Sequence, residues 1–198
     1  MNFLLDNCTF SVLTKEIIQS TFEFDCGHKD LNEFFLNDTL DYSKQLLGKS
    51  YCFKYDENPK IIICAFTLSN DSIKANFLPN SRKKKVNDLI PRVKQYRSYP
   101  AVLIGRLGVN KDFKGRGIGK ELMDFIKSWF IDSNNKTGCR FLVVDAYNEP
   151  GPIKYYQNNG FKFLFGDEDQ ERLYTGLNND RDVNTRLMYF DLLELSTI

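Results

Sequence analysis

The sequence has little histidine, no pair of closely spaced cysteines and no long apolar run. His28 is the single histidine, so sites that need several imidazoles are excluded. The five cysteines form no C-x-x-C pair, and Cys26 with His28 offers too few ligands for a zinc site. The longest apolar runs are far shorter than a membrane span. We therefore expect neither a bound metal nor a membrane partner.

An excess of charge of one sign is also missing, because 27 Lys and Arg residues face 26 Asp and Glu residues. With a formal net charge of +1, the chain has no overall basic field that would announce a nucleic-acid partner. The start of the chain carries Asp6 and no basic segment, unlike a secretory signal peptide. The odd number of cysteines, with Cys52 and Cys64 inside apolar stretches, suits a reducing compartment. We expect a cytoplasmic protein.

What the chain does have is enough length and apolar content for a packed domain. Its 198 residues are 42% hydrophobic, and neither a Pro-, Gly- or Ser-rich linker nor an internal repeat divides them. We expect a single domain over residues 1–198 with a polar insertion at about 166–185. Apolar periodicity and turn residues predict helices over residues 28–48, 118–130 and 152–159, a surface helix and loop over 72–90, and strands over 51–55, 61–68, 100–109, 140–146, 161–165 and 186–193.

The order of these elements predicts a mixed sheet. The strands over 51–55 and 61–68 are joined by the turn at residues 56–59, which favours an antiparallel hairpin. Strand–helix–strand units in the second half favour parallel pairing there. The predicted fold class is therefore α/β, or α+β in some schemes.

A basic, glycine-bearing turn separates the strand over 100–109 from the helix over 118–130. It runs from Lys114 to Lys120 and alternates glycines with other residues. N–H groups at the start of a helix point outward along the axis, and the helix dipole favours an anion there. Glycine lacks the Cβ that would keep a phosphate away from the backbone. A diphosphate is the natural ligand of residues 114–120, which we call the glycine turn.

Three alternatives compete for the glycine turn. A P-loop needs G-x-x-x-x-G-K-[ST], but Gly115 and Gly119 are one residue too close and Glu121 follows Lys120. A dinucleotide fingerprint needs G-x-G-x-x-G, which the spacing of Gly115, Gly117 and Gly119 does not provide. A tight strand-to-helix turn without a ligand stays open, although the basic residues favour binding.

The glycine turn resembles the acetyl-CoA loop of the GNAT N-acetyltransferase superfamily, written [QR]-x-x-G-x-[GA]. Lys114 stands at the first position, a departure from Gln or Arg, while Gly117 and Gly119 match. The resemblance implies acetyl-CoA as the co-substrate, with its diphosphate on this loop and its pantetheine arm against the preceding strand. The residues implied to bind acetyl-CoA are Leu107, Gly108, Val109, Lys114, Gly115, Arg116, Gly117, Ile118, Gly119, Lys120 and Asn148.

A second segment, at residues 144–161, resembles the same family, in which the pattern A-x-x-[FY]-Y-x-x-x-G-F recurs. Tyr156 occupies the tyrosine position, and Gly160 with Phe161 forms the closing pair. In the family this tyrosine points at the departing sulfur after an amine has attacked the thioester. A phenol with a pKa of about 10 can give the thiolate a proton at that moment. Tyr156 is thus the predicted catalytic residue, and an aromatic core residue is the alternative.

The resemblance also implies the GNAT fold, a mixed, mostly antiparallel sheet with splayed central parallel strands flanked by helices. The F-x-C-G segment at residues 24–27 and the T-L-S at 67–69 look like segments of GNAT toxins that act on aminoacyl-tRNA. The acceptor amine stays open between a small molecule, a peptide or protein, and a charged tRNA. A non-catalytic acyl-CoA-binding module is the remaining alternative, and a homodimer also stays open.

The general base is harder to assign, because no Asp or Glu occurs between Leu89 and Lys111. Water or a carboxylate elsewhere, such as Glu33, would serve. An α-amine, with a pKa of about 7.7–8, needs less help in losing its proton than lysine at about 10.4. The run from Arg82 to Lys85 either contacts RNA phosphates or forms an ordinary solvated face.

Overall fold

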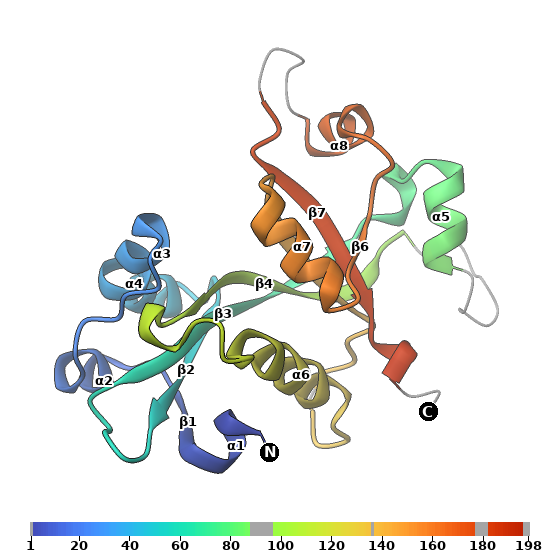
Figure 1. The fold of residues 1–198 in the computed structure, drawn as a ribbon. Coiled ribbons are helices and arrows are strands. Elements are labelled where there is room, and N and C mark those ends of the chain that lie inside the picture. The colour runs from blue at the N-terminus through green and yellow to red at the C-terminus, as the bar shows by residue number, and fades with distance from the viewer. Residues whose placement is uncertain (1, 88–96, 136, 177–181, 196–198) are drawn as a thin grey trace. The chain divides into compact units, whose positions relative to one another are not determined.

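The computed structural model describes residues 2–87, 97–135, 137–176 and 182–195 (Figure 1). The chain divides into two compact units. Unit 1 comprises Met1–Ser69 and Ile104–Asp132, and unit 2 comprises Asn70–Leu103 and Ser133–Ile198. The chain passes from one unit to the other inside two strands, β3 (Ile62–Ile73) and β4 (Tyr99–Val109), and once more between Asp132 and Ser133. The single domain over residues 1–198 stays a prediction.

The strands of the described residues form one mixed sheet with the order β1-β2-β3-β4-β5-β7-β6. The strands besides β3 and β4 are β1 (Cys8–Val12), β2 (Lys49–Tyr55), β5 (Phe141–Tyr147), β6 (Lys162–Phe163) and β7 (Thr185–Asp191). β4 and β5 pair in parallel, whereas β1 with β2, β2 with β3, and β7 with both β5 and β6 pair antiparallel. The predicted mixed, mostly antiparallel sheet is confirmed.

Unit 1 contains the predicted antiparallel hairpin of β2 and β3, in which Cys52 pairs with Ala65. β1 adds a further strand that the sequence reasoning missed, because Cys8 is the only buried residue in this edge strand. An edge strand with one buried residue shows no clear alternation of apolar and polar positions. The other elements of unit 1 are α1 (Phe3–Asn7), α2 (Lys15–Ser20), α3 (Lys29–Glu33), the π-helical turn η1 (Phe34–Asp38), α4 (Thr39–Lys44), the 3-10 turn η3 (Lys111–Phe113) and α6 (Ile118–Ile131).

The predicted helix over residues 28–48 forms only in part. Helical structure runs through α3, η1 and α4 and ends at Lys44, after which Leu46 takes a positive φ of 58°. The predicted helix stop at Gly48 is wrong. Gly48 lies at the packing contact with Tyr42, since a Cβ on Gly48 would sit 2.5 Å from Cε1 of that ring.

The apolar face of α6 packs against the antiparallel strands of unit 1 (Figure 1). The ring centroids of Phe125 and Phe53 are 5.0 Å apart, and those of Trp129 and Phe10 are 5.2 Å apart. The buried residues of this face include Ile118, Leu122 and Ile126. This packing fixes the start of α6, where the glycine turn ends.

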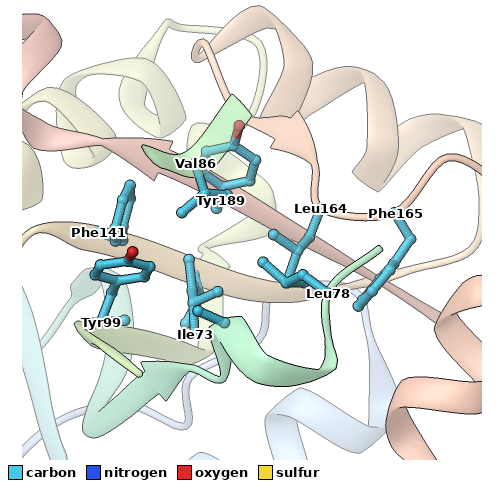
Figure 2. Close-up of a cluster of buried hydrophobic side chains, with 11 residues drawn as sticks. Ile73, Leu78, Val86, Tyr99, Phe141, Leu164, Phe165 and Tyr189 are labelled. Atoms are coloured by element: carbon cyan, nitrogen blue, oxygen red, sulfur yellow. The ribbon is translucent and has the colours of Figure 1, made fainter. Parts of the chain in front are cut away.

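Unit 2 builds its core from strands and from the segment between β3 and β4, as Figure 2 shows. Its helices and turns are the 3-10 turn η2 (Ala75–Phe77), α5 (Asn80–Asn87), α7 (Pro150–Asn158), α8 (Glu168–Thr175) and the 3-10 turn η4 (Leu192–Leu195). The surface location expected for residues 72–90 is wrong for three apolar side chains of this segment, whereas Phe77 is exposed. Ile73, Leu78 and Val86 are at most 6% exposed and join the core cluster. Residues 88–90 lie outside the described part.

The polar insertion at residues 166–185 contains a helix, α8, that the sequence reasoning missed. Glu171 on α8 is 3% exposed, and its carboxylate accepts hydrogen bonds from Nε of Arg186, at 2.7 Å, and from the backbone N–H of Leu187. A buried carboxylate with a charged partner and a backbone donor anchors the helix to β7. Residues 177–181 lie outside the described part. Among the described helices, none has the length and hydropathy of a bilayer span.

Candidate active site

The glycine turn leads from η3 into α6, in unit 1. Gly115 and Gly117 both have left-handed backbone conformations, with φ of 77° and 81°, and Gly117 is the N-cap of α6. No side chain caps this N-terminus by a hydrogen bond. A Cβ built on either glycine would meet no atom of the described residues within 4 Å. The backbone at the start of a 14-residue helix is therefore open to a ligand, and the helix dipole favours an anion there.

The three basic side chains of the glycine turn are exposed but not equivalent. Nζ of Lys120 lies 2.5 Å from the carboxylate of Asp124, one turn further along α6. This pair neutralises much of the local charge of Lys120. The guanidinium of Arg116 lies 5.0 Å from the ring centroid of Phe113, a cation–π contact that orients it beside the turn. Lys114 and Arg116 are thus the main cationic groups that the turn offers to an anion.

The segment before the glycine turn, the end of β4, is held by residues 24–27. Leu107 and Val109 are partly exposed, whereas Gly108 is buried. A Cβ on Gly108 would sit 3.0 Å from Cβ of Cys26 and 3.2 Å from Cε1 of Phe24. Gly108 is therefore needed for this close approach, whatever ligand its backbone binds. Packing against β4 therefore gives a structural explanation for Phe24 and Cys26 in the F-x-C-G segment.

Asp25, which sequence reasoning missed, links the same segment to η3. Its carboxylate forms an ion pair with Nζ of Lys111 at 2.7 Å and accepts hydrogen bonds from the Gly27 N–H and the Asn32 side chain, each at 2.7 Å. The Lys111 side chain, first, and then the two hydrogen bonds lower the pKa of Asp25. An ionised Asp25 thus fixes the lead-in to the glycine turn. The only signal in the sequence was an acidic residue inside F-x-C-G. Its partner, Lys111, lies 86 positions later, and no local pattern reveals such a pair.

Tyr156 lies on α7, in unit 2. Its ring is partly buried, 5.0 Å from the ring centroid of Tyr155 and 5.5 Å from that of Phe161. Within the described residues, no hydrogen bond involves its hydroxyl. Burial, and second the negative charge of Asp145, raise the pKa of Tyr156 above its usual value. The phenol therefore keeps its proton at neutral pH, which a general acid requires.

Asn148 and Glu33 are less suited to the roles considered for them. The Asn148 amide donates to the backbone oxygen of Val183 and to the Glu168 carboxylate, both at 2.9 Å. It ties the end of β5 to the first residue of α8 and to the segment before β7, so contact with acetyl-CoA through its amide N–H groups would break these bonds. Glu33 is an exposed residue at the end of α3. The described residues contain no cluster of three or more His, Cys, Asp or Glu placed to hold a metal ion.

The structure brings the predicted residues together in two groups. Unit 1 holds the glycine turn and the end of β4, with the buried Ile118 as the first residue of α6. Unit 2 holds Tyr156 and Asn148. The group in unit 1 has the properties of an anion-binding backbone. The group in unit 2 has a protonated phenol, that of Tyr156, whose hydroxyl makes no hydrogen bond within the described residues.

Residues 86–163, which include both the glycine turn and Tyr156, match the family described as "Acetyltransferase (GNAT) domain". The family match therefore covers the part of the chain that holds the candidate site. No curated protein matches the sequence. Three similar solved structures are given with sequence identity, TM-score, and coverage of this chain and of the other chain. They are a tyrosine-to-phenylalanine mutant of KacT (20%, 0.71, 97% and 99%), AtaT complexed with acetyl-methionyl-tRNAfMet (20%, 0.66, 96% and 98%) and AtaTR bound with acetyl-CoA (21%, 0.66, 97% and 98%).

At these identities the similarity to the solved structures shows a shared fold, over nearly the whole of each chain. The expected GNAT fold is confirmed beyond the 86–163 segment that the family match covers.

Proposed function

We propose that this protein transfers the acetyl group of acetyl-CoA to a primary amine, with Tyr156 as the general acid. The observation that carries the proposal is that one GNAT match, over residues 86–163, contains both the open glycine turn and Tyr156. In this account the turn binds the diphosphate through backbone N–H groups, assisted by Lys114 and Arg116. The backbone of residues 107–109 pairs with the pantetheine arm.

The chemistry assigned to Tyr156 follows from its protonation state. The nitrogen of the neutral amine forms a bond to the thioester carbon, and its surplus proton goes to water or to a base that stays unassigned. The carbon–sulfur bond then breaks, the amide product forms, and the departing sulfur takes the phenolic proton, which water later returns to Tyr156. A phenol whose pKa is raised holds its proton at neutral pH and is therefore able to donate it as charge develops on the sulfur.

We propose an α-amine as the acceptor, and aminoacyl-tRNA is the specific candidate. No Asp or Glu occurs between Leu89 and Lys111, and an α-amine needs less help in deprotonation than a lysine side chain. AtaT, which has the same fold over 98% of its length, is seen with acetyl-methionyl-tRNAfMet, an acetylated α-amine on a tRNA. The four consecutive basic residues from Arg82 to Lys85 lie on α5, where they supply positive charge that can contact RNA phosphates.

An acceptor screen with radiolabelled acetyl-CoA tests the proposal. The acceptors are polyamines, an N-terminal peptide mixture, a lysine-blocked version of that mixture, and bulk aminoacyl-tRNA beside the same tRNA after deacylation. We expect label on the aminoacyl-tRNA and none on the deacylated tRNA. Label on a polyamine or lysine side chain alone would contradict the α-amine assignment. Tight binding of acetyl-CoA with no label on any acceptor would favour the non-catalytic module.

A further inference from the structure

Unit 2 contains a cavity that the acetyl-transfer account does not use. It has a volume of about 360 Å³ and lies among α5, α7, β6, the segment after β6, and β7. Small-molecule sites are commonly about 300–1,000 Å³. Its apolar floor includes Val86, Leu164, Phe165 and Tyr189, four neighbours in the core cluster of Figure 2.

The rim of this cavity is cationic. Arg82 and Lys85 reach it from α5, and Lys162 reaches it from β6. Lys162 already has a partner, since its Nζ lies 2.7 Å from Glu194. Arg82 and Lys85 have no carboxylate partner in the described part of the chain. None of the residues that line the cavity is an Asp or Glu, so the lining supplies two uncompensated positive charges to whatever occupies it.

The end of the Arg82 side chain lies at the wall of the cavity. A Cβ on Gly166, which lines the cavity, would sit 2.6 Å from the Nη2 atom of Arg82. The hydroxyl of Tyr189, another lining residue, points away from Ile73 and Leu78 in Figure 2. Burial, the largest cause, raises the pKa of Tyr189, whereas the charges of Lys162 and then Arg82 lower it.

We propose that this cavity binds a phosphate-bearing ligand of the nucleotide class, with the phosphate on Arg82 and Lys85. A guanidinium binds phosphate through paired N–H donors, and a nearby ammonium adds a point charge. The exposed Gln157 can donate or accept hydrogen bonds, and the apolar floor suits the rest of an organic ligand rather than a bare ion. The ligand is a free nucleotide or a nucleotide of an RNA chain. The site shares no residue with the glycine turn, and in the RNA case it rests on the aminoacyl-tRNA proposal, which already assigns Arg82 to Lys85 to RNA phosphates.

Calorimetric titration of AMP at low salt tests the proposal in the full-length protein. We expect saturable binding to wild type, weakened about tenfold or more in Arg82→Gln and in Lys85→Gln, as for the loss of a charge-assisted hydrogen bond. Lys84→Gln is the matched control, because Lys84 lies in the same basic run but does not line the cavity. It should change AMP affinity less than twofold.

A short single-stranded RNA, titrated in parallel, distinguishes the two sources. If it binds at least tenfold more tightly than AMP and loses affinity in Arg82→Gln, the natural ligand is RNA; if AMP binds as tightly, it is a free nucleotide. No saturable binding of either probe overturns the proposal, as does equal weakening by Lys84→Gln. Loss of AMP binding in Gly117→Asp, with normal binding in Arg82→Gln, would place AMP on the glycine turn and also overturn it. Acetyl-CoA affinity is measured in Arg82→Gln as well, and a normal value shows that a loss of AMP binding does not come from failure of the acetyl-transfer proposal. An unchanged melting temperature shows that each variant is folded.

Discussion

The roles proposed for the glycine turn and for Tyr156 depend on opposite kinds of chemistry. The role of the glycine turn depends on backbone conformation and helix polarity, with two left-handed glycines and two uncompensated basic side chains inside seven consecutive residues. The role of Tyr156 depends on a single hydroxyl whose pKa is raised by burial and then by Asp145. The proposal therefore predicts that affinity and turnover are separable. A change in the turn should alter binding of acetyl-CoA, and a change at Tyr156 should alter its use.

The largest effect is expected for Tyr156→Phe, which keeps the ring and removes the proton donor. The value of kcat should fall by roughly 100-fold, the low end of the range for a positioned acid, because CoA thiolate with a pKa of about 8.5 is already a fair leaving group. Acetyl-CoA affinity, measured by calorimetry, should change less than twofold.

Tyr155→Phe is the matched control, since Tyr155 is the neighbouring phenol on α7. It should leave kcat within about twofold of wild type. Equal kcat values for wild type and Tyr156→Phe, under conditions where chemistry limits the rate, would show that Tyr156 only packs.

Gly117→Asp tests the other side of the comparison. A side chain at φ of 81° is strained, and a carboxylate at the start of α6 repels the diphosphate. Acetyl-CoA affinity should fall at least tenfold, with kcat at saturation much less affected. Gly138→Asp makes the same charge change at an exposed glycine with no atom of the described residues near its Cβ position, and should leave affinity unchanged. A folded Gly117→Asp protein with wild-type affinity would remove the turn from the binding site.

Gly108→Ala separates packing from binding at the end of β4. The added methyl would press on Cys26 and Phe24, so we expect about 1–3 kcal/mol less free energy of unfolding, as for other overpacked sites. Gly105→Ala is the control on the same strand, where a Cβ meets no atom of the described residues within 4 Å, and should change stability by less than about 0.5 kcal/mol. Urea denaturation measures both. Equal stability of the two variants would contradict the packing account of F-x-C-G.

The smallest effect concerns pH. Because burial raises the pKa of Tyr156, the phenol stays protonated as the pH rises to its ordinary value of about 10. The profile of kcat at saturating substrates should therefore show no decline from Tyr156 between about pH 8 and 10. An alkaline decline with a midpoint below pH 10 that disappears in Tyr156→Phe would show that the phenol is not shielded as described.

The sequence predicted the elements whose apolar residues repeat clearly, such as α6 and the β2–β3 hairpin. It missed β1 and α8, because one has a single buried residue and the other is held by the buried pair of Glu171 and Arg186. The burial of Val86 was also missed. This residue directly follows four basic residues, a pattern that is typical of a solvent-exposed helix face.

The candidate site divides in the same way. The glycine turn is contiguous, so its chemistry can be read from sequence. The ion pair of Asp25 with Lys111, the neutralisation of Lys120 by Asp124 and the amide bonds of Asn148 depend on tertiary contacts or side-chain geometry. No local pattern states whether a basic or amide side chain is available to a ligand or already engaged.

The most direct test of the central claim is the rate of thiol release from acetyl-CoA in the presence and absence of aminoacyl-tRNA. The account predicts that wild type releases one CoA thiol for each acetyl group found on the amino acid, that release depends on the acceptor, and that Tyr156→Phe slows it roughly 100-fold. Acetyl-CoA that binds at the glycine turn but releases no thiol with any amine acceptor would contradict the claim that this protein is an acetyltransferase acting through Tyr156.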